Sequence, residues 1–233
     1  MSVVGSQNYG TAVEGSDTDI KVAYLPTFEE FYRNSFAHTD TGSPDSLVDY
    51  TLHPVHEFLR HAFKGNMNFW EVFFSDSLEF NPNFVEGKLF AQLARNVVVD
   101  SPMYNFNAMR GMAIQKDKQA YRNYKSDKAD FYKSAQHAMR MLDTIMTYQA
   151  CGSLYLNLLD LPTHHRIEWA DWRKDQTLTI QEYADAFEMK LKMVDNLEDI
   201  FKEHHTNTDV RSNRERCRES LDSWLIRLVK ETS

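Results

Sequence analysis

Two aspartates separated by one residue, Asp17 and Asp19, are the first residues in this chain whose type and spacing could do chemistry. Apolar side chains recur at every second position from Ile20 to Tyr24, which predicts a β-strand. Residues i and i+2 of a strand point to the same face, so the two carboxylates lie side by side and repel each other unless a cation sits between them. Such oxygen ligands suit Mg²⁺, which proteins bind through one or two carboxylates together with substrate phosphates.

A glycine–serine turn, Gly5-Ser6, follows a short apolar strand at residues 2–4, and ten residues separate Ser6 from Asp17. Backbone N–H groups in such a turn are a common way for a chain to hold a phosphate. The turn and the two acids together therefore indicate a phosphate site next to a cation site. The alternative is a surface loop rich in Gly, Ser and Asp that leads into an ordinary strand.

This order of an apolar strand, Gly-Ser, ten residues and Asp-x-Asp resembles the signature of the nucleotidyltransferase superfamily, which includes the polymerase-β-like enzymes. The pairs Tyr9-Gly10 and Ser16-Asp17 extend the likeness to predicted bacterial and phage nucleotidyltransferases, some of them linked to RNA repair. The resemblance implies that Asp17 and Asp19 bind Mg²⁺ or Mn²⁺ and are catalytic. It also implies nucleotide contacts, which would come from Gly5, Ser6, Tyr9 and Ser16.

Asp49 is the candidate for a third acid, because a second strand is predicted over residues 46–51. Two-metal phosphoryl transfer uses a further carboxylate beside the attacking hydroxyl, so Asp49 is predicted to be both catalytic and metal-binding. In the related families an acid is followed by a helix, a turn with Gly and Asn, and a glutamate between apolar residues. The matching features here are Asp49, residues 53–63, Gly65-Asn66 and Glu71. A solvent-facing strand acid remains the alternative for Asp49, and structural roles remain open for Asn66 and Glu71.

A helix predicted over residues 126–150 supplies cations that could oppose these acids. Lys133, His137 and Arg140 are three or four residues apart and share a helix face. The segment resembles the Lys-x-x-x-His/Tyr-Ala-x-Arg segment of the same predicted enzymes. Arg could grip a triphosphate with its bidentate fork and Lys as a point charge. Lys133, His137 and Arg140 are therefore predicted to bind the nucleotide, with a contact to the acceptor also open for His137. Ordinary packing or capping is the alternative for His137, and a solvated helix face is the alternative for most lysines of this basic run.

Charge is unevenly distributed along the chain, whose formal net charge is −8 over 233 residues. Acids dominate residues 1–105, whereas lysine and arginine dominate residues 109–140. The overall acidity argues against a protein that coats nucleic acid non-specifically. A small nucleotide, an RNA end or a protein acceptor all stay possible. The absence of a long apolar run or a signal-like N-terminus, together with two widely spaced cysteines, leads us to expect a cytoplasmic protein that does not enter a membrane.

The elements that must position these residues predict an α+β fold. The resemblance implies a small mixed β-sheet in a palm-like catalytic domain, residues 1–102, and the apolar spacing beyond it indicates an α-helical domain, residues 103–233. The polar segment 39–44 is predicted to be a loop. A capping box at Thr179 opens a helix expected to run to Phe201. The last helix begins among four arginines that could touch nucleic acid or a partner, with a solvated segment as the alternative: Arg211, Arg214, Arg216 and Arg218.

The leading functional hypothesis is a metal-dependent transfer of an NMP from an NTP to an acceptor hydroxyl, with release of pyrophosphate. One alternative is a non-catalytic relative that binds nucleotide or neutralises a partner, as in toxin–antitoxin or phage-defence pairs. Another keeps the chemistry but transfers the NMP to a protein side chain.

Overall fold

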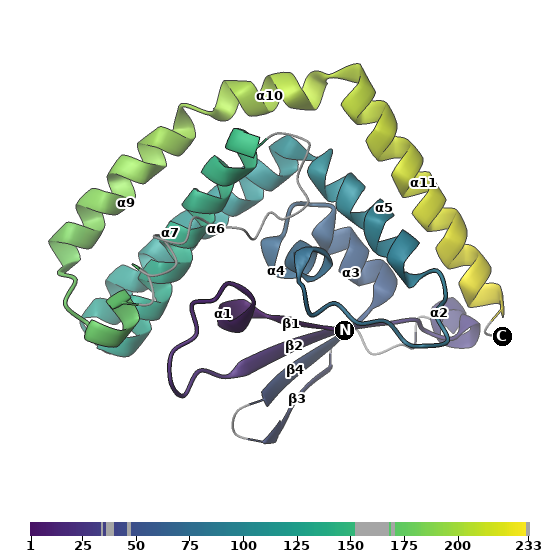
Figure 1. Ribbon diagram of the computed structural model, residues 1–233, viewed down its shortest axis with the longest axis horizontal. Coiled ribbons are helices and arrows are strands. Elements are labelled where there is room, and N and C mark those ends of the chain that lie inside the picture. Colours follow the sequence, from purple (N-terminus) through teal and green to yellow (C-terminus); the bar gives the residue numbers. More distant parts are fainter. Residues whose placement is uncertain (34, 36–39, 46–47, 152–167, 169–170, 232–233) are drawn as a thin grey trace.

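The computed structural model describes residues 1–231 except residues 34, 36–39, 46–47, 152–167 and 169–170. A small β-sheet built from the N-terminal segments lies at one end of the molecule, and the helices gather on one side of it (Figure 1). The expected α+β class, with a small mixed sheet followed by helices, is confirmed.

The sheet has four strands in the order β1-β2-β4-β3, with bounds β1 Ser2–Val4, β2 Thr18–Tyr24, β3 Asp40–Asp45 and β4 Val48–Pro54. The central pair β2 and β4 is parallel, and both outer strands pair antiparallel with their neighbours. In the register of the central pair, Asp19 lies directly opposite Asp49. The sheet therefore places two of the predicted acids on neighbouring strands.

The loop predicted over residues 39–44 is wrong for residues 40–44, because β3 occupies them and pairs with β4, whereas residue 39 lies outside the described residues. Gly42 faces Tyr50, and a Cβ at Gly42 would come within 2.5 Å of the tyrosine ring. The ladder shifts register between Gly42 and Asp45. Turn-forming residues are tolerated here because an edge strand has one side free of ladder hydrogen bonds and accepts irregularities.

Short helices connect and cover the strands of the N-terminal half: α1 Gly5–Asn8, α2 Phe28–Arg33, α3 Val55–Ala62, α4 Met67–Trp70, the 3₁₀ helix η1 Glu71–Phe74 and α5 Gly87–Val99. The Asn66 side chain caps α4 by accepting a hydrogen bond from the backbone N–H of Asn68 at 3.1 Å. Gly65, with φ of +82°, allows the turn before α4 to pass so close to Tyr104 that a Cβ would overlap the Tyr104 backbone. Asn66 thus has a structural role as a helix cap.

Long helices form the C-terminal half: α6 Pro102–Tyr124, α7 Lys128–Cys151, α9 Ile180–Asp195, α10 Glu198–Thr206 and α11 Thr208–Glu231. The capping box at Thr179 is confirmed, since its hydroxyl accepts from the Glu182 N–H at 3.2 Å. The single helix predicted from residue 180 to 201 is wrong, because it breaks between Asp195 and Glu198. The break turns α10 away from α9 in an arch over α6 and α7 (Figure 1), and Phe201 still reaches the core.

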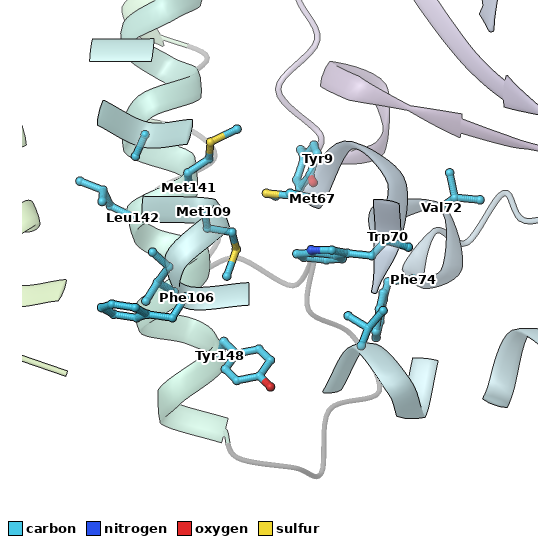
Figure 2. Close-up of a cluster of buried hydrophobic side chains, with 14 of the residues drawn as sticks. Tyr9, Met67, Trp70, Val72, Phe74, Phe106, Met109, Met141, Leu142 and Tyr148 are labelled. Atoms are coloured by element: carbon cyan, nitrogen blue, oxygen red, sulfur yellow. The ribbon is translucent and has the colours of Figure 1, made fainter. Parts of the chain in front are cut away.

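One hydrophobic core runs through both halves of the chain. Figure 2 shows Tyr9 and Trp70 of the N-terminal half in the same cluster as Met109 and Met141 of α6 and α7. On α11, Trp224 lies 4.7 Å from the Phe84 ring, centroid to centroid. The core therefore crosses the boundary proposed at residue 102, and a division into two domains stays a prediction. Within the described ranges, none of the helices has the length and apolar character needed to cross a bilayer.

Candidate functional site

A cavity of about 270 Å³ lies between the sheet and helix α7. Its lining includes every residue predicted for the site except Tyr9: Gly5, Ser6, Ser16, Asp17, Asp19, Asp49, Lys133, His137 and Arg140. Tyr9 is fully buried and lies under the cavity, against the Arg140 guanidinium. The fold thus brings together residues from separate segments of the chain, which the sequence alone does not place side by side.

The acidic wall of the cavity is formed by Asp17, Asp19 and Asp49. Burial raises the pKa of Asp19 above its usual range, Lys133 opposes the rise, and the carboxylates of Asp49 and Asp17 add to it. Asp49 also accepts a hydrogen bond from the Ser43 hydroxyl of β3. The raised pKa of Asp19 therefore reflects partial burial first, and repulsion from the neighbouring carboxylates makes a smaller contribution.

The Gly5-Ser6 turn sits directly against this wall. Gly5 has φ of +67°, a left-handed conformation that glycine adopts without strain. A Cβ at Gly5 would come within 2.5 Å of Asp19 Oδ2. Residue 5 therefore has to be glycine for two reasons: its backbone conformation and the carboxylate that occupies the space next to it.

The acidic wall fits a hard divalent cation, although it does not form a finished ligand set. Among the residues that the structure describes, no three His, Cys, Asp or Glu side chains are grouped so that they could hold a metal ion. Mg²⁺ commonly takes only one or two carboxylates from a protein and completes its shell with water and substrate phosphates. The all-oxygen donors and their mutual repulsion suit Mg²⁺ or Mn²⁺, bound together with a phosphate substrate.

Arg140 dominates the opposite wall. Its side chain is 3% exposed, and its guanidinium carbon lies 3.8 Å from the centre of the Tyr9 ring. Two of its nitrogens, Nε and Nη1, are buried without a hydrogen-bond partner in the described part of the chain. Leaving such donors unsatisfied costs free energy, and an anion in the cavity would satisfy them with charge-assisted hydrogen bonds.

His137 reaches the cavity from the same helix face as Arg140. Burial lowers its pKa well below 6.5, and the positive charges of Arg140, Lys116, Lys133 and Arg173 lower it further. The imidazole is therefore neutral at pH 7, with one nitrogen able to donate a hydrogen bond and the other able to accept one. This concentration of cations around a neutral histidine indicates a pocket prepared for negative charge.

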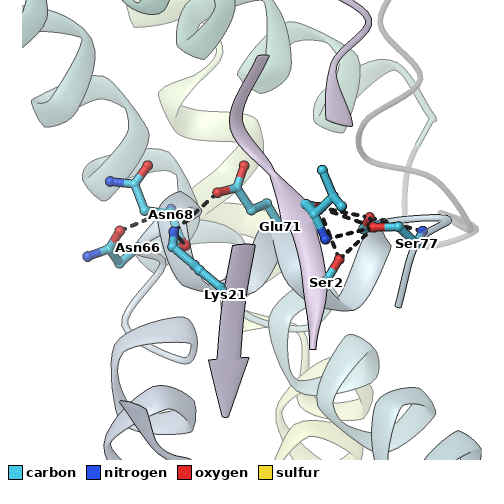
Figure 3. Close-up of polar contacts among 8 residues, drawn as sticks. Ser2, Lys21, Asn66, Asn68, Glu71 and Ser77 are labelled. Atoms are coloured by element: carbon cyan, nitrogen blue, oxygen red, sulfur yellow. Dashed lines mark hydrogen bonds and ion pairs between the residues drawn. The ribbon is translucent and has the colours of Figure 1, made fainter. Parts of the chain in front are cut away.

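A buried ion pair joins the sheet to η1 beside the cavity. Lys21 Nζ lies 3.3 Å from Glu71 Oε1, with 15% and 5% of the two side chains exposed, and it also donates to the carbonyl of Asn68 (Figure 3). Glu71 lies near the buried Tyr9 phenol without a hydrogen bond of good geometry. Burial first, and the Glu71 charge second, raise the Tyr9 pKa. Glu71 thus anchors Lys21, two residues from Asp19 on the same strand face.

Protein-family models, curated proteins and solved structures were compared with the chain, and none matches it. The resemblance to nucleotidyltransferases thus depends on the motif residues alone.

Besides Lys21, two cations near the cavity were not singled out from the sequence. Arg173, in the helical turn at residues 171–175, lines the cavity near Asp17, and burial lowers its pKa while the Asp17 charge opposes this. Lys116 of α6 lies close enough to Lys133 and Arg140 that their charges add to the effect of burial in lowering its pKa. Lys116 belongs to the basic run noted in the sequence. Arg173 ends an aromatic and charged stretch, residues 169–173, whose sequence suggests base stacking or packing between helices; residues 169–170 lie outside the described residues. Nothing in the sequence places Arg173 at this cavity, because it is 33 residues beyond Arg140 and only folding brings it back.

Proposed function

We propose that the protein is a metal-dependent nucleotidyltransferase that moves an NMP from an NTP to an acceptor hydroxyl and releases pyrophosphate. The observation that carries the proposal is the cavity with three carboxylates on one wall and Arg140 on the other. Arg140 is buried, and its Nε and Nη1 have no hydrogen-bond partner among the described residues. Opposed walls of this kind suit a ligand that carries both phosphates and a bound cation.

In the proposed complex, the triphosphate lies between the two walls. Arg140 donates from Nε and Nη1 to phosphate oxygens, and Lys133 adds a mobile positive charge. Backbone N–H groups of the Gly5-Ser6 turn contact the same group. Asp17, Asp19 and Asp49 would hold Mg²⁺ or Mn²⁺, which when bound neutralises phosphate charge and orients the reacting oxygens.

Asp49 orients the acceptor hydroxyl in this scheme and takes its proton. The hydroxyl oxygen attacks the α-phosphorus and forms a new O–P bond. The bond from the α-phosphorus to the oxygen that bridges to the β-phosphorus breaks, and pyrophosphate leaves with the bonding electrons. The protein contributes mainly position and charge stabilisation, which requires a rigid acidic wall and cations that are already in place.

The direct test incubates the purified protein with each α-labelled NTP, with Mg²⁺ or Mn²⁺, and with total RNA or total protein. We expect label on one polymer from the native protein, and a loss of at least about a thousandfold in Asp17→Asn/Asp19→Asn, since the phosphate-bound cation loses its protein ligands. Asp130→Asn/Asp199→Asn removes two exposed carboxylates outside the cavity and is the matched control.

Label that moves equally well in the Asp17→Asn/Asp19→Asn protein would contradict the proposal. So would NTP binding by the native protein without label on any acceptor, which is the outcome expected of a non-catalytic relative. Label on protein rather than on RNA would keep the chemistry and change the acceptor.

A further inference from the structure

A different cavity, also of about 270 Å³, lies between α3, the start of α6 and α11, and shares no lining residue with the candidate active site. Its lining combines apolar side chains, Leu59, Phe63 and Leu225, with cations: Arg60, Lys64, Arg214 and Arg218. Among the described residues, Asp222 is the one acid in the lining. Arg60 lies 3.7 Å from Glu57, and because the Arg60 side chain is largely exposed, this ion pair is weak. This concentration of positive charge stands out in a chain with a net charge of −8.

An aromatic ring with cationic neighbours lines this cavity. Tyr104 is 44% exposed, the Arg214 guanidinium carbon lies 4.7 Å from its ring centre, and the His205 ring meets it edge-on at 5.5 Å. Arg214 Nε is buried and has no hydrogen-bond partner among the described residues. As at Arg140, a buried guanidinium nitrogen without a partner indicates an anionic ligand.

We propose that this cavity binds one nucleotide of a single-stranded nucleic acid. The base packs on the apolar floor and stacks on the adjoining Tyr104 ring. The neighbouring phosphates contact Arg214, Arg218 and Lys64. Aromatic rings that stack bases, flanked by cations that contact the backbone, are the usual means by which proteins hold single strands. Free phosphate would use the cations but not the apolar floor. That the strand is the acceptor of the transfer rests on the function proposed above, whereas the binding itself does not.

The binding is tested by fluorescence anisotropy with a labelled single-stranded RNA of about 12 nucleotides, titrated at several salt concentrations. We expect Arg214→Gln/Arg218→Gln to weaken binding at least about tenfold at low salt. The slope of log affinity against log salt should shrink by about 1.4, because each phosphate contact to a single strand contributes about 0.7. Tyr104→Leu should weaken binding about tenfold with the slope unchanged, because it removes stacking and no charge.

The matched control is Arg216→Gln/Lys230→Gln, which removes two charges from exposed positions on α11 that do not line the cavity. It should bind RNA within about twofold of the native protein. Equal weakening in this control would overturn the proposal, because binding would then follow overall charge. Circular dichroism checks folding, and if Arg214→Gln/Arg218→Gln unfolds, Arg60→Gln/Lys64→Gln replaces it in the same titration.

Further measurements distinguish RNA from other ligands and distinguish this inference from the proposed function. Displacement of RNA by inorganic phosphate at matched ionic strength would overturn the inference in favour of a phosphate site, and so would the absence of RNA binding. Asp17→Asn/Asp19→Asn should bind RNA as the native protein does, because its substitutions lie in the other cavity. Binding through this cavity without any transfer of label would refute the proposed function and leave this inference standing.

Discussion

The two walls of the candidate active site are built in opposite ways. The acidic wall comes from neighbouring strands, and Asp17, Asp19 and Asp49 are all exposed enough to meet solvent. The basic wall comes from one helix whose key cation, Arg140, is 3% exposed. Exposed carboxylates stay hydrated and can exchange water for a cation. A buried guanidinium loses its water on folding, and this costs free energy. A ligand that accepts its hydrogen bonds offsets that cost.

Of the single substitutions that compare the two walls, Gly5→Ala should have the largest effect, because it disturbs the acidic wall. A Cβ at residue 5 would meet Asp19 Oδ2 at 2.5 Å, and a displacement of about 1 Å at a reacting group can cost about a hundredfold in rate. Gly10→Ala is the control: its φ of +63° imposes a similar backbone cost of about 1–2 kcal/mol, but Gly10 is exposed and does not line the cavity. Single-turnover transfer should fall about a hundredfold only in Gly5→Ala, and equal losses in both would refute the role of the close approach.

The next effect concerns the burial of Arg140. Arg140→Met should leave the ligand-free protein as stable as before or more stable by up to about 1–4 kcal/mol, because a buried charge is replaced by an apolar chain of similar length. NTP binding should weaken about tenfold to a hundredfold, because charge-assisted hydrogen bonds are lost. Denaturant unfolding and NTP titration measure the two quantities.

Arg110→Met is the control for this change, since Arg110 forms a partly exposed pair with Asp195 at 2.6 Å. It should cost at most about 1 kcal/mol of stability and leave NTP binding unchanged. The claim that Arg140 is buried for ligand binding and not for stability would be contradicted if Arg140→Met strongly destabilised the ligand-free protein while NTP still bound normally.

The smallest effect is a dependence of stability on pH that originates at His137. Its pKa in the folded protein lies well below 6.5, so below about pH 6.5 the unfolded chain binds a proton that the folded chain does not. The free energy of unfolding should therefore fall as pH drops, by at most about 1.4 kcal/mol per unit, and level off below the folded pKa. Denaturation at pH 7.5 and 5.5 should show a smaller loss in His137→Gln than in the native protein. An identical loss in both, or the same change in the control His204→Gln, would contradict this origin.

Local signals predicted elements correctly in both halves of the chain. Thr179 with Glu182 predicted its helix start, because a capping box involves only residues within one turn. Alternation predicted the strand β2, which the structure places at Thr18–Tyr24. The edge strand β3 was missed, because its pairing with β4 overrides the turn preference of Gly42. The break between α9 and α10 was missed as well, since neither Gly nor Pro marks it.

The sequence by itself determined which chemical groups this protein can use. The Gly5-Ser6 turn, the carboxylates of Asp17 and Asp19, and the helical spacing of Lys133 and Arg140 follow from residue order and local geometry. Only the tertiary structure decided that Asp49 lies opposite Asp19, that Arg140 is buried against Tyr9, and that Arg173 joins the cavity. The reason is physical: strand register, burial and the meeting of distant segments depend on packing energies summed over the whole core, which no local window of sequence contains.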